Sequence, residues 1–213
     1  MNSCCRHTSK SKRCTRKDGK VFSLPRRFTR KRCLRGVRGF SMRSSCAPYS
    51  MCGGSRRNKD KSAVAVFDMN GITGTVNFRE QKKGLFIKYN IQGLKPGLHG
   101  FHVHKYGDLT EGCESACAHF NPDGKEHGGI NGKNRHAGDF GNIITSNNGL
   151  TKGSFHVNGV SLDCKKANCI VGRSIIVHAD RDDLGKGGNK ESKKTGNAGK
   201  RLACAVIGHA RPI

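Results

Sequence analysis

The sequence of 213 residues lacks any stretch of about 20 consecutive apolar residues, the length that a membrane-spanning helix needs. Its N-terminal part has no apolar central run of the kind found in secretory signals, and the chain contains no Asn-x-Ser/Thr glycosylation site. These absences argue against a membrane span and against classical secretion. They leave the cytoplasm as the expected location.

Acidic residues are scarce in the first 60 positions. Residues 1–60 carry 18 Lys or Arg against two Asp or Glu, whereas residues 61–213 carry 22 against 13. Because residues 1–60 combine high charge with few apolar side chains, we expect a disordered, basic and cysteine-rich extension. Residues 61–213 are long enough for one globular domain.

Three interpretations of this extension stay open. Arg- and Ser-rich sequence with few acids is typical of a plastid or mitochondrial transit segment. A basic arm that binds nucleic acid or another polyanion has the same composition. The segment can also be translated sequence upstream of a later start, at Met42 or Met51.

The cysteines lack any Cys-x-x-Cys pair, so neither a zinc knuckle nor a thioredoxin-type site is indicated. Six of the eleven lie in the extension and five in the domain: Cys4, Cys5, Cys14, Cys33, Cys46 and Cys52, then Cys113, Cys117, Cys164, Cys169 and Cys204. Their number alone does not decide the redox compartment.

Short β-rich runs separated by glycine fill the domain. Eight such runs occur, at residues 62–68, 71–78, 84–91, 98–104, 141–145, 153–159, 172–179 and 202–210. With no convincing helix, this pattern predicts an all-β sandwich or flattened barrel. Residues 105–137 and 179–201 do not fit it, and loops of this length inside a compact domain are usually functional.

Two histidines stand two residues apart in the run "GFHVHKYGD". Because side chains alternate between the faces of a strand, His102 and His104 point to the same face and can share one metal ion. His99 has the opposite parity and is expected to be structural. A lone His-x-His pattern is too short to establish a metal site, so the evidence for one has to come from other residues.

The first long loop supplies three more histidines and an aspartate within about twenty residues: His119, His127, His136 and Asp139. Imidazole and carboxylate ligands are those of tetrahedral zinc. Since the loop has almost no apolar residues, a bound ion would supply the order that burial cannot. His178, at the mouth of the second long loop, can converge with His102 and His104.

These motifs together resemble the copper–zinc superoxide dismutases. The resemblance covers residues 62 to about 210 and rests on "GFHVHKYGDLT", the spacing of the four loop ligands, "GRSIIVH" and "GKGGNKESKKTGNAGKRLACAVIG". It implies an eight-stranded Greek-key sandwich that disproportionates superoxide to dioxygen and hydrogen peroxide, with one copper and one zinc ion per subunit. It does not extend to residues 1–60.

The resemblance also implies the ligands. Copper would be bound by His102, His104, His119 and His178, and zinc by His119, His127, His136 and Asp139. His119 would bridge the two ions and deliver a proton to the second superoxide. Zinc would take no part in electron transfer, because it has no accessible redox change.

Further residues match the family pattern. Arg201 would hold the anionic substrate, and Asp182 would accept hydrogen bonds from one copper and one zinc ligand, with Asp183 as the alternative register. Cys113 and Cys204 would form the family's disulfide. Cys117, Cys164 and Cys169 lie outside that pattern and are interpreted first as small buried or edge thiols, and second as extra crosslinks.

Five lysines, Lys186, Lys190, Lys193, Lys194 and Lys200, crowd the second long loop and predict electrostatic guidance of an anion. The alternative to an active dismutase is a family member that binds copper and zinc without turnover, as a metal chaperone or buffer. Family members in eukaryotes are mostly homodimers, so we expect a dimer that uses Val171, Val206 and His209. The source, the need for a chaperone and the dimer's strength stay open.

Overall fold

The structure is a computed structural model that describes residues 4, 11–24, 26, 28–34, 40–49 and 61–211. The chain divides into two compact units, Met1–Lys59 and Asp60–Ile213. This division falls one residue from the boundary expected from the sequence. The predicted disorder of residues 1–60 also concerns residues 1–3, 5–10, 25, 27, 35–39 and 50–60, which lie outside the described residues.

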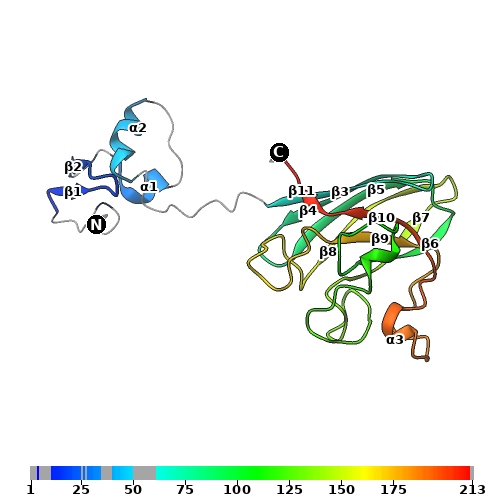
Figure 1. Ribbon diagram of the computed structural model, residues 1–213. Coiled ribbons are helices and arrows are strands. Elements are labelled where there is room, and N and C mark those ends of the chain that lie inside the picture. Colours follow the sequence, from blue (N-terminus) through cyan, green and yellow to red (C-terminus); the bar gives the residue numbers. More distant parts are fainter. Residues whose placement is uncertain are drawn as a thin grey trace. The chain divides into compact units, whose positions relative to one another are not determined.

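The larger unit is built from two antiparallel sheets (Figure 1). The five-stranded sheet has the order β11-β3-β4-β5-β8, from Gly208–His209, Ser62–Met69, Ile72–Glu80, Leu85–Gln92 and Leu150–Val157. The four-stranded sheet has the order β10-β9-β6-β7, from Arg201–Val206, Ser174–His178, Gly97–Val103 and Asp139–Thr145. The chain crosses repeatedly between the sheets, as the predicted sandwich requires.

Alternation along the strands explains the core. In β5, Leu85, Ile87 and Ile91 are fully buried, and Lys88 and Asn90 between them are exposed. Their faces meet buried residues of the four-stranded sheet, among them Phe101 and Val103 of β6. Since β6 buries these two side chains in the core, His102 between them lies on the opposite face of its sheet.

The predicted strand count is wrong by one within the described domain. The eighth run, residues 202–210, forms two strands, because β10 pairs with β9 and β11 pairs with β3 in the other sheet. The change of sheet falls at Ile207, whose side chain is fully buried. One run therefore joins both sheets, which a hydrophobic pattern alone does not reveal.

Both long loops leave the four-stranded sheet. The first lies between β6 and β7 and contains the 3-10 turn η3, Glu114–Ala116, and the second lies between β9 and β10 and contains the short helix α3, Ser192–Thr195. The disulfide Cys113–Cys204 ties the first loop to β10. A second disulfide, Cys164–Cys169, confirms for these two cysteines the crosslink that was the second interpretation.

The described residues of the extension have local structure that the prediction of disorder did not include. They form β1 (Arg13–Thr15), β2 (Val21–Ser23), α1 (Arg30–Leu34), α2 (Phe40–Cys46) and η2 (Ala47–Tyr49). The physical reason is cysteine, since Cys4–Cys14 and Cys33–Cys46 are disulfides. Disorder elsewhere in residues 1–60 stays a prediction.

No helix among the described residues is long and apolar enough to cross a membrane.

Candidate metal centre

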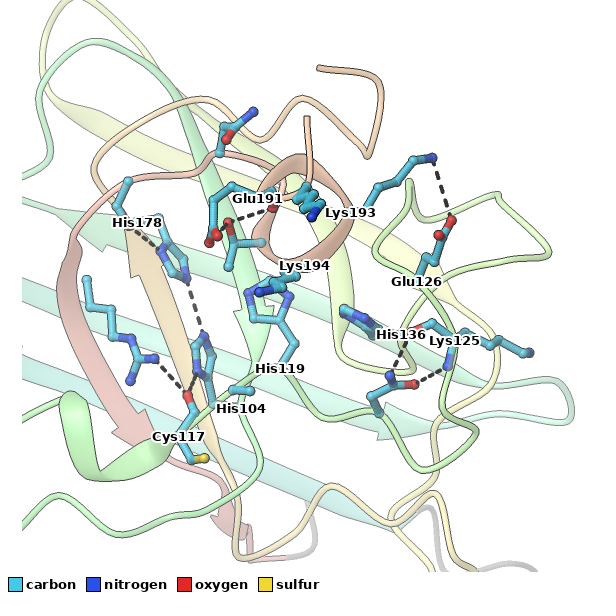
Figure 2. Close-up of a pocket in the computed structure, with 17 residues that line it drawn as sticks. His104, Cys117, His119, Lys125, Glu126, His136, His178, Glu191, Lys193 and Lys194 are labelled. Carbon is cyan, nitrogen blue, oxygen red and sulfur yellow. Dashed lines mark hydrogen bonds and ion pairs between the residues drawn. The ribbon is translucent and has the colours of Figure 1, made fainter. Parts of the chain in front are cut away.

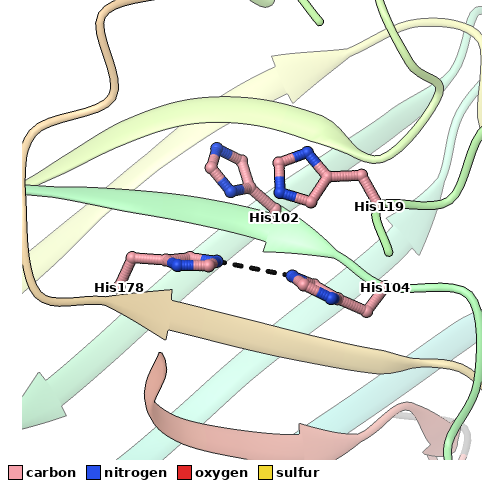
Figure 3. A group of neighbouring side chains, drawn as sticks. All are labelled: His102, His104, His119 and His178. Atoms are coloured by element: carbon pink, nitrogen blue, oxygen red, sulfur yellow. Dashed lines mark hydrogen bonds between the residues drawn. The ribbon is translucent and has the colours of Figure 1, made fainter. Parts of the chain in front are cut away.

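Four histidines from separate parts of the chain meet in one group (Figure 3). His102 comes from β6, His178 ends β9, and His104 pairs with His119 in an isolated β-bridge. One ring nitrogen of each lies within 4.8 Å of the others, and all four residues are buried. The structure thus brings together the four residues expected to bind copper.

Two of these rings face each other in a way that favours a cation. His104 Nδ1 lies 2.7 Å from the Cys117 carbonyl oxygen and His178 Nδ1 lies 3.2 Å from that of Gly199, so each Nδ1 carries the proton and donates. Each Nε2 then holds a lone pair, and the two Nε2 atoms lie 3.3 Å apart. Burial lowers the pKa of both rings, that of His178 to about 2, so a shared proton is not stable between them.

The other two rings also turn a nitrogen toward the group. His102 Nε2 donates to Asp182 Oδ2 over 2.9 Å, which leaves its buried Nδ1 without a hydrogen-bond partner. The buried Nε2 of His119 likewise has none. Burial lowers the pKa of His119 to about 3, with His102 adding to the effect, so this ring stays neutral at pH 7. Buried polar atoms without partners are costly unless a ligand satisfies them.

A second group gathers around one oxygen of Asp139. The Nδ1 atoms of His119, His127 and His136 lie 2.9, 3.0 and 3.1 Å from Asp139 Oδ1. One carboxylate oxygen has two lone pairs and cannot accept three good hydrogen bonds, and His127 Nδ1 makes none. Burial alone would raise the pKa of Asp139, but the three histidines hold it well below its usual range.

Asp182 links the two groups. Its Oδ2 accepts from His102 and its Oδ1 accepts from His127 Nε2 over 2.8 Å. Burial would lower the pKa of His127, but the contacts with Asp139 and Asp182 outweigh it and raise that pKa to about 9. Gly196 is needed here, because a Cβ at this position would collide with the Asp182 carboxylate. The alternative, Asp183, contacts Ser192, Gly185 and Asn197 and no histidine.

A cavity of about 1160 Å³ opens beside the histidines (Figure 2). Its charged lining comes from both long loops: Lys125, Glu126, Lys190, Glu191, Lys193, Lys194 and Arg201. The Arg201 guanidinium donates to the carbonyl oxygens of Cys113 over 2.6 Å and Cys117 over 2.8 Å. Lys186 and Lys200, also expected at the rim, are not among the lining residues.

The comparisons with known proteins agree with this geometry. A sequence model of the family described as "Copper/zinc superoxide dismutase (SODC)" matches residues 72–207. The "Superoxide dismutase [Cu-Zn]" of Paramecium bursaria Chlorella virus 1 is 56% identical over 155 residues, which are 72% of this chain and 81% of the viral protein.

The chain belongs to the copper/zinc superoxide dismutase family. Its activity is the disproportionation of superoxide, and its metals are copper and zinc. The fold has a solved counterpart as well: the crystal structure of the clock protein EA4 matches with a TM-score of 0.68 and 40% identity, over 71% of this chain and 96% of that chain. The expectations about family, fold class and activity are confirmed.

The donor atoms fit the metals of this family. The first group offers four imidazole nitrogens, which suit copper, and the second offers three imidazole nitrogens and one carboxylate oxygen, which suit zinc. In both groups the fit rests on lone pairs that face one another or lack a partner. A cation in each group would satisfy them.

Two arginines that support the dismutase site were missed in the sequence. Arg135, 8% exposed, donates to the carbonyl oxygens of His136, Ala137, Asp139 and Asn158 and so braces the first long loop. The only feature of the sequence that could have indicated this role is the position of Arg135 directly before His136. Arg173 donates to the carbonyl oxygen of Cys169, four residues before it, and lies 3.6 Å over the Phe120 ring. The contact with Phe120 joins distant segments and leaves no sequence pattern.

His99 is structural, as expected from its parity. It is 4% exposed, and its ring nitrogens lie 2.8 Å from the carbonyl oxygens of His178 and Lys95. These contacts hold the backbone of His178 rather than a metal. Cys117 remains an exposed free thiol among the described cysteines.

Proposed function

We propose that each subunit of this dismutase holds one copper ion on His102, His104, His119 and His178, and one zinc ion on His119, His127, His136 and Asp139. The observation that carries the assignment is the pair of Nε2 atoms of His104 and His178, 3.3 Å apart, each with its proton committed to a backbone carbonyl on Nδ1. Only a ligand that accepts both lone pairs suits this arrangement.

His119 belongs to both groups. Its Nδ1 faces Asp139 and its Nε2 faces the copper group, so the ring can bridge two cations after losing its second proton. Copper, when bound, supplies the electron exchange of the reaction. With copper bound, His119 Nε2 would also be the atom that holds a proton and delivers it to the reduced substrate.

Arg201 and the lysines serve the substrate. Two backbone carbonyl oxygens fix the Arg201 guanidinium, and the side chain is 20% exposed. It can therefore hold an anion at the cavity mouth. Lys125, Lys190, Lys193 and Lys194 add positive potential around that mouth. Because salt screens such charges, the rate constant should fall as the Debye length shrinks from ~10 Å at 0.1 M to ~3 Å at 1 M.

Matched alanine variants test the assignment. His104→Ala removes a ligand of the copper group only, His136→Ala removes one of the zinc group only, and His119→Ala affects both. We expect metal analysis of the purified proteins to show selective loss of copper, selective loss of zinc and loss of both. His104→Ala and His119→Ala should no longer accelerate the decay of superoxide. Loss of zinc from His104→Ala, with copper retained, would contradict the assignment.

We also propose that the domain forms a homodimer through the surface around Val171, Val206 and His209. Val206 is 41% exposed, an apolar side chain on the surface of β10, and Gly107 lies against it. If His209 becomes buried between two copies, its protonation opposes association. Sedimentation at pH 8 should show a dimer that weakens toward pH 5, and a monomer at pH 8 would overturn the proposal.

For location we propose the cytoplasm, with import into a plastid or mitochondrion as the alternative, and the N-terminal sequence of the protein from its native source decides between them. We further propose that residues 1–60 bind a polyanion, because they carry 18 cationic and two acidic residues. Binding to a polyanion should weaken steeply as salt is added.

A further inference from the structure

Arginine dominates the positive charge of the extension but not that of the dismutase domain. Residues 1–60 contain 12 Arg and six Lys, whereas residues 61–213 contain six Arg and 16 Lys. The planar guanidinium matches the two oxygens of a phosphate with a fork of parallel N–H groups, while lysine offers a point charge. The extension is thus enriched in the residue that suits phosphate recognition.

The extension also has a small core of its own. Cys4, Cys14, Cys33, Met42, Cys46 and Tyr49 are buried together, each at most 7% exposed. Four of the six belong to the disulfides Cys4–Cys14 and Cys33–Cys46. A segment this short cannot bury enough apolar surface to fold alone, and disulfides are the usual substitute.

This core leaves the cations on the surface. Seven Lys and Arg side chains are exposed among the described residues of the extension: Lys12, Arg13, Lys17, Lys20, Lys31, Arg32 and Arg43. Asp18, the acid described there, forms an ion pair with Arg16 and so does not compensate the exposed charges. The surface is positive with almost no local neutralisation.

We propose that the described residues between Cys4 and Tyr49 form a disulfide-stabilised module that binds the phosphodiester backbone of nucleic acid without regard to sequence. This deepens the proposed binding of a polyanion by naming the partner, and it gives Cys4, Cys14, Cys33 and Cys46 a role. Binding would keep the dismutase domain close to nucleic acid.

A lipid surface fits the described residues less well. Helices α1 and α2 have five and seven residues, too short to lie in a membrane interface with an apolar face. Phe22, Leu24 and Phe28 are partly buried against the cluster, and Val21 is the large apolar side chain that is exposed among the described residues of the extension. Attraction to a membrane would then depend on charge alone, and a polymer offers regularly spaced phosphates to the exposed cations in the same way.

The test measures binding of the full chain to a fluorescein-labelled 30-base-pair DNA of mixed sequence, and to an RNA duplex of equal length, between 50 and 300 mM salt. The variant R13Q/R32Q/R43Q removes three exposed charges from the extension. The control K82Q/K83Q/K152Q removes three exposed charges from the dismutase domain. Both variants should keep wild-type superoxide turnover.

We expect the extension variant to bind at least about tenfold more weakly at 100 mM salt and its log-log salt slope to fall by about one for each lost phosphate contact. The control variant should bind as the wild type does. Equal weakening in both variants would overturn the module, because general charge would then explain binding. R13K/R32K/R43K should also bind more weakly, and wild-type affinity there would overturn the role of the guanidinium fork.

A second pair of variants tests the disulfides without a reductant, which would also attack Cys113–Cys204. C33S/C46S keeps every charge, so a disordered arm would bind unchanged, whereas the module predicts a several-fold loss of affinity. C164S/C169S, in the dismutase domain, is the control and should bind normally. Vesicles containing phosphatidylserine and the polysaccharide heparin are the competing partners. Weak binding to both DNA and RNA together with tight binding to either competitor would overturn the nucleic-acid assignment and keep the polyanion proposal.

Discussion

Asp182 is fully buried and joins the two groups of histidines that we propose bind copper and zinc. Its two carboxylate oxygens have different partners. Oδ1 accepts from His127 Nε2 over 2.8 Å and from the Leu184 backbone N–H over 2.7 Å, whereas Oδ2 accepts from His102 Nε2 over 2.9 Å. In Asp182→Asn the amide oxygen should stay at the Oδ1 position, because two donors point there. The amide NH₂ then replaces Oδ2 and faces the N–H of His102.

Two donors facing each other force His102 to move or to shift its proton to Nδ1. Either change removes the lone pair that Nδ1 turns toward the other three histidines proposed to bind copper. Loss of such supporting partners usually weakens metal affinity about 10- to 100-fold, or about 1.4–2.8 kcal/mol. We therefore expect Asp182→Asn to weaken copper binding by this amount while zinc binding changes much less.

Titration of the metal-loaded variant against a chelator, with copper and zinc measured separately, checks this. The cupric absorption band should also shift, since the position of one ligand changes. Asp183→Asn is the matched control, because its carboxylate contacts no histidine and the ratio of copper to zinc should stay at the wild-type value. Preferential loss of zinc from Asp182→Asn would refute the reasoning.

Three further results are expected. Arg201→Ala should retain both metals but lower turnover at least about fivefold, since one charge about 4 Å from an anion contributes about 1–4 kcal/mol at effective dielectric constants of 80 to 20. Wild-type turnover at low salt would contradict this expectation. Asp139→Ala removes the acceptor of the Gly128 and His136 backbone N–H groups as well as a proposed zinc ligand. Differential scanning calorimetry should therefore show Tm lowered by about 10 °C, and His127→Ala should lower it by less. Unchanged melting would contradict this expectation. Without metals, the free energy of unfolding should peak near pH 6.5. The pKa values of His119 and His178 are lowered to about 3 and about 2, so both residues cost stability as the pH falls below the pKa of an unfolded histidine. The pKa of His127 is raised to about 9, so its contribution to stability is lost as the pH rises toward 9. Urea unfolding from pH 5 to pH 9 measures this, and a flat profile would contradict it.

The sequence predicted the metal groups well because their chemistry is local. His102 and His104 share a face through the two-residue period of a strand, and the other loop ligands stand within about twenty residues of one another. Whether each residue binds the metal assigned to it stays a prediction. Seven of the eight runs each correspond to one strand of the domain, and the eighth corresponds to two.

What the sequence could not show depends on contacts between distant segments. The change of sheet at Ile207 is set by pairing of β11 with β3, which no local pattern encodes. The disulfide Cys164–Cys169 was one of several arrangements open to the cysteines, because spacing does not determine connectivity. Arg173 reaches Phe120 only after the sandwich has formed.

Pairing of β11 with β3 brings the two borders of the dismutase domain together. The backbone N–H of Ala210 donates to the carbonyl oxygen of Ser62 over 2.9 Å. The first strand of the domain and its last described strand therefore lie side by side. A domain with adjacent borders can be inserted into a surface loop of another protein, or circularly permuted, without stretching its sheets. The turn at Ser146–Gly149, away from the histidines in sequence and outside both long loops, offers a place for new ends. Insertion or permutation at these places would leave the strands and loops that carry the histidines unbroken.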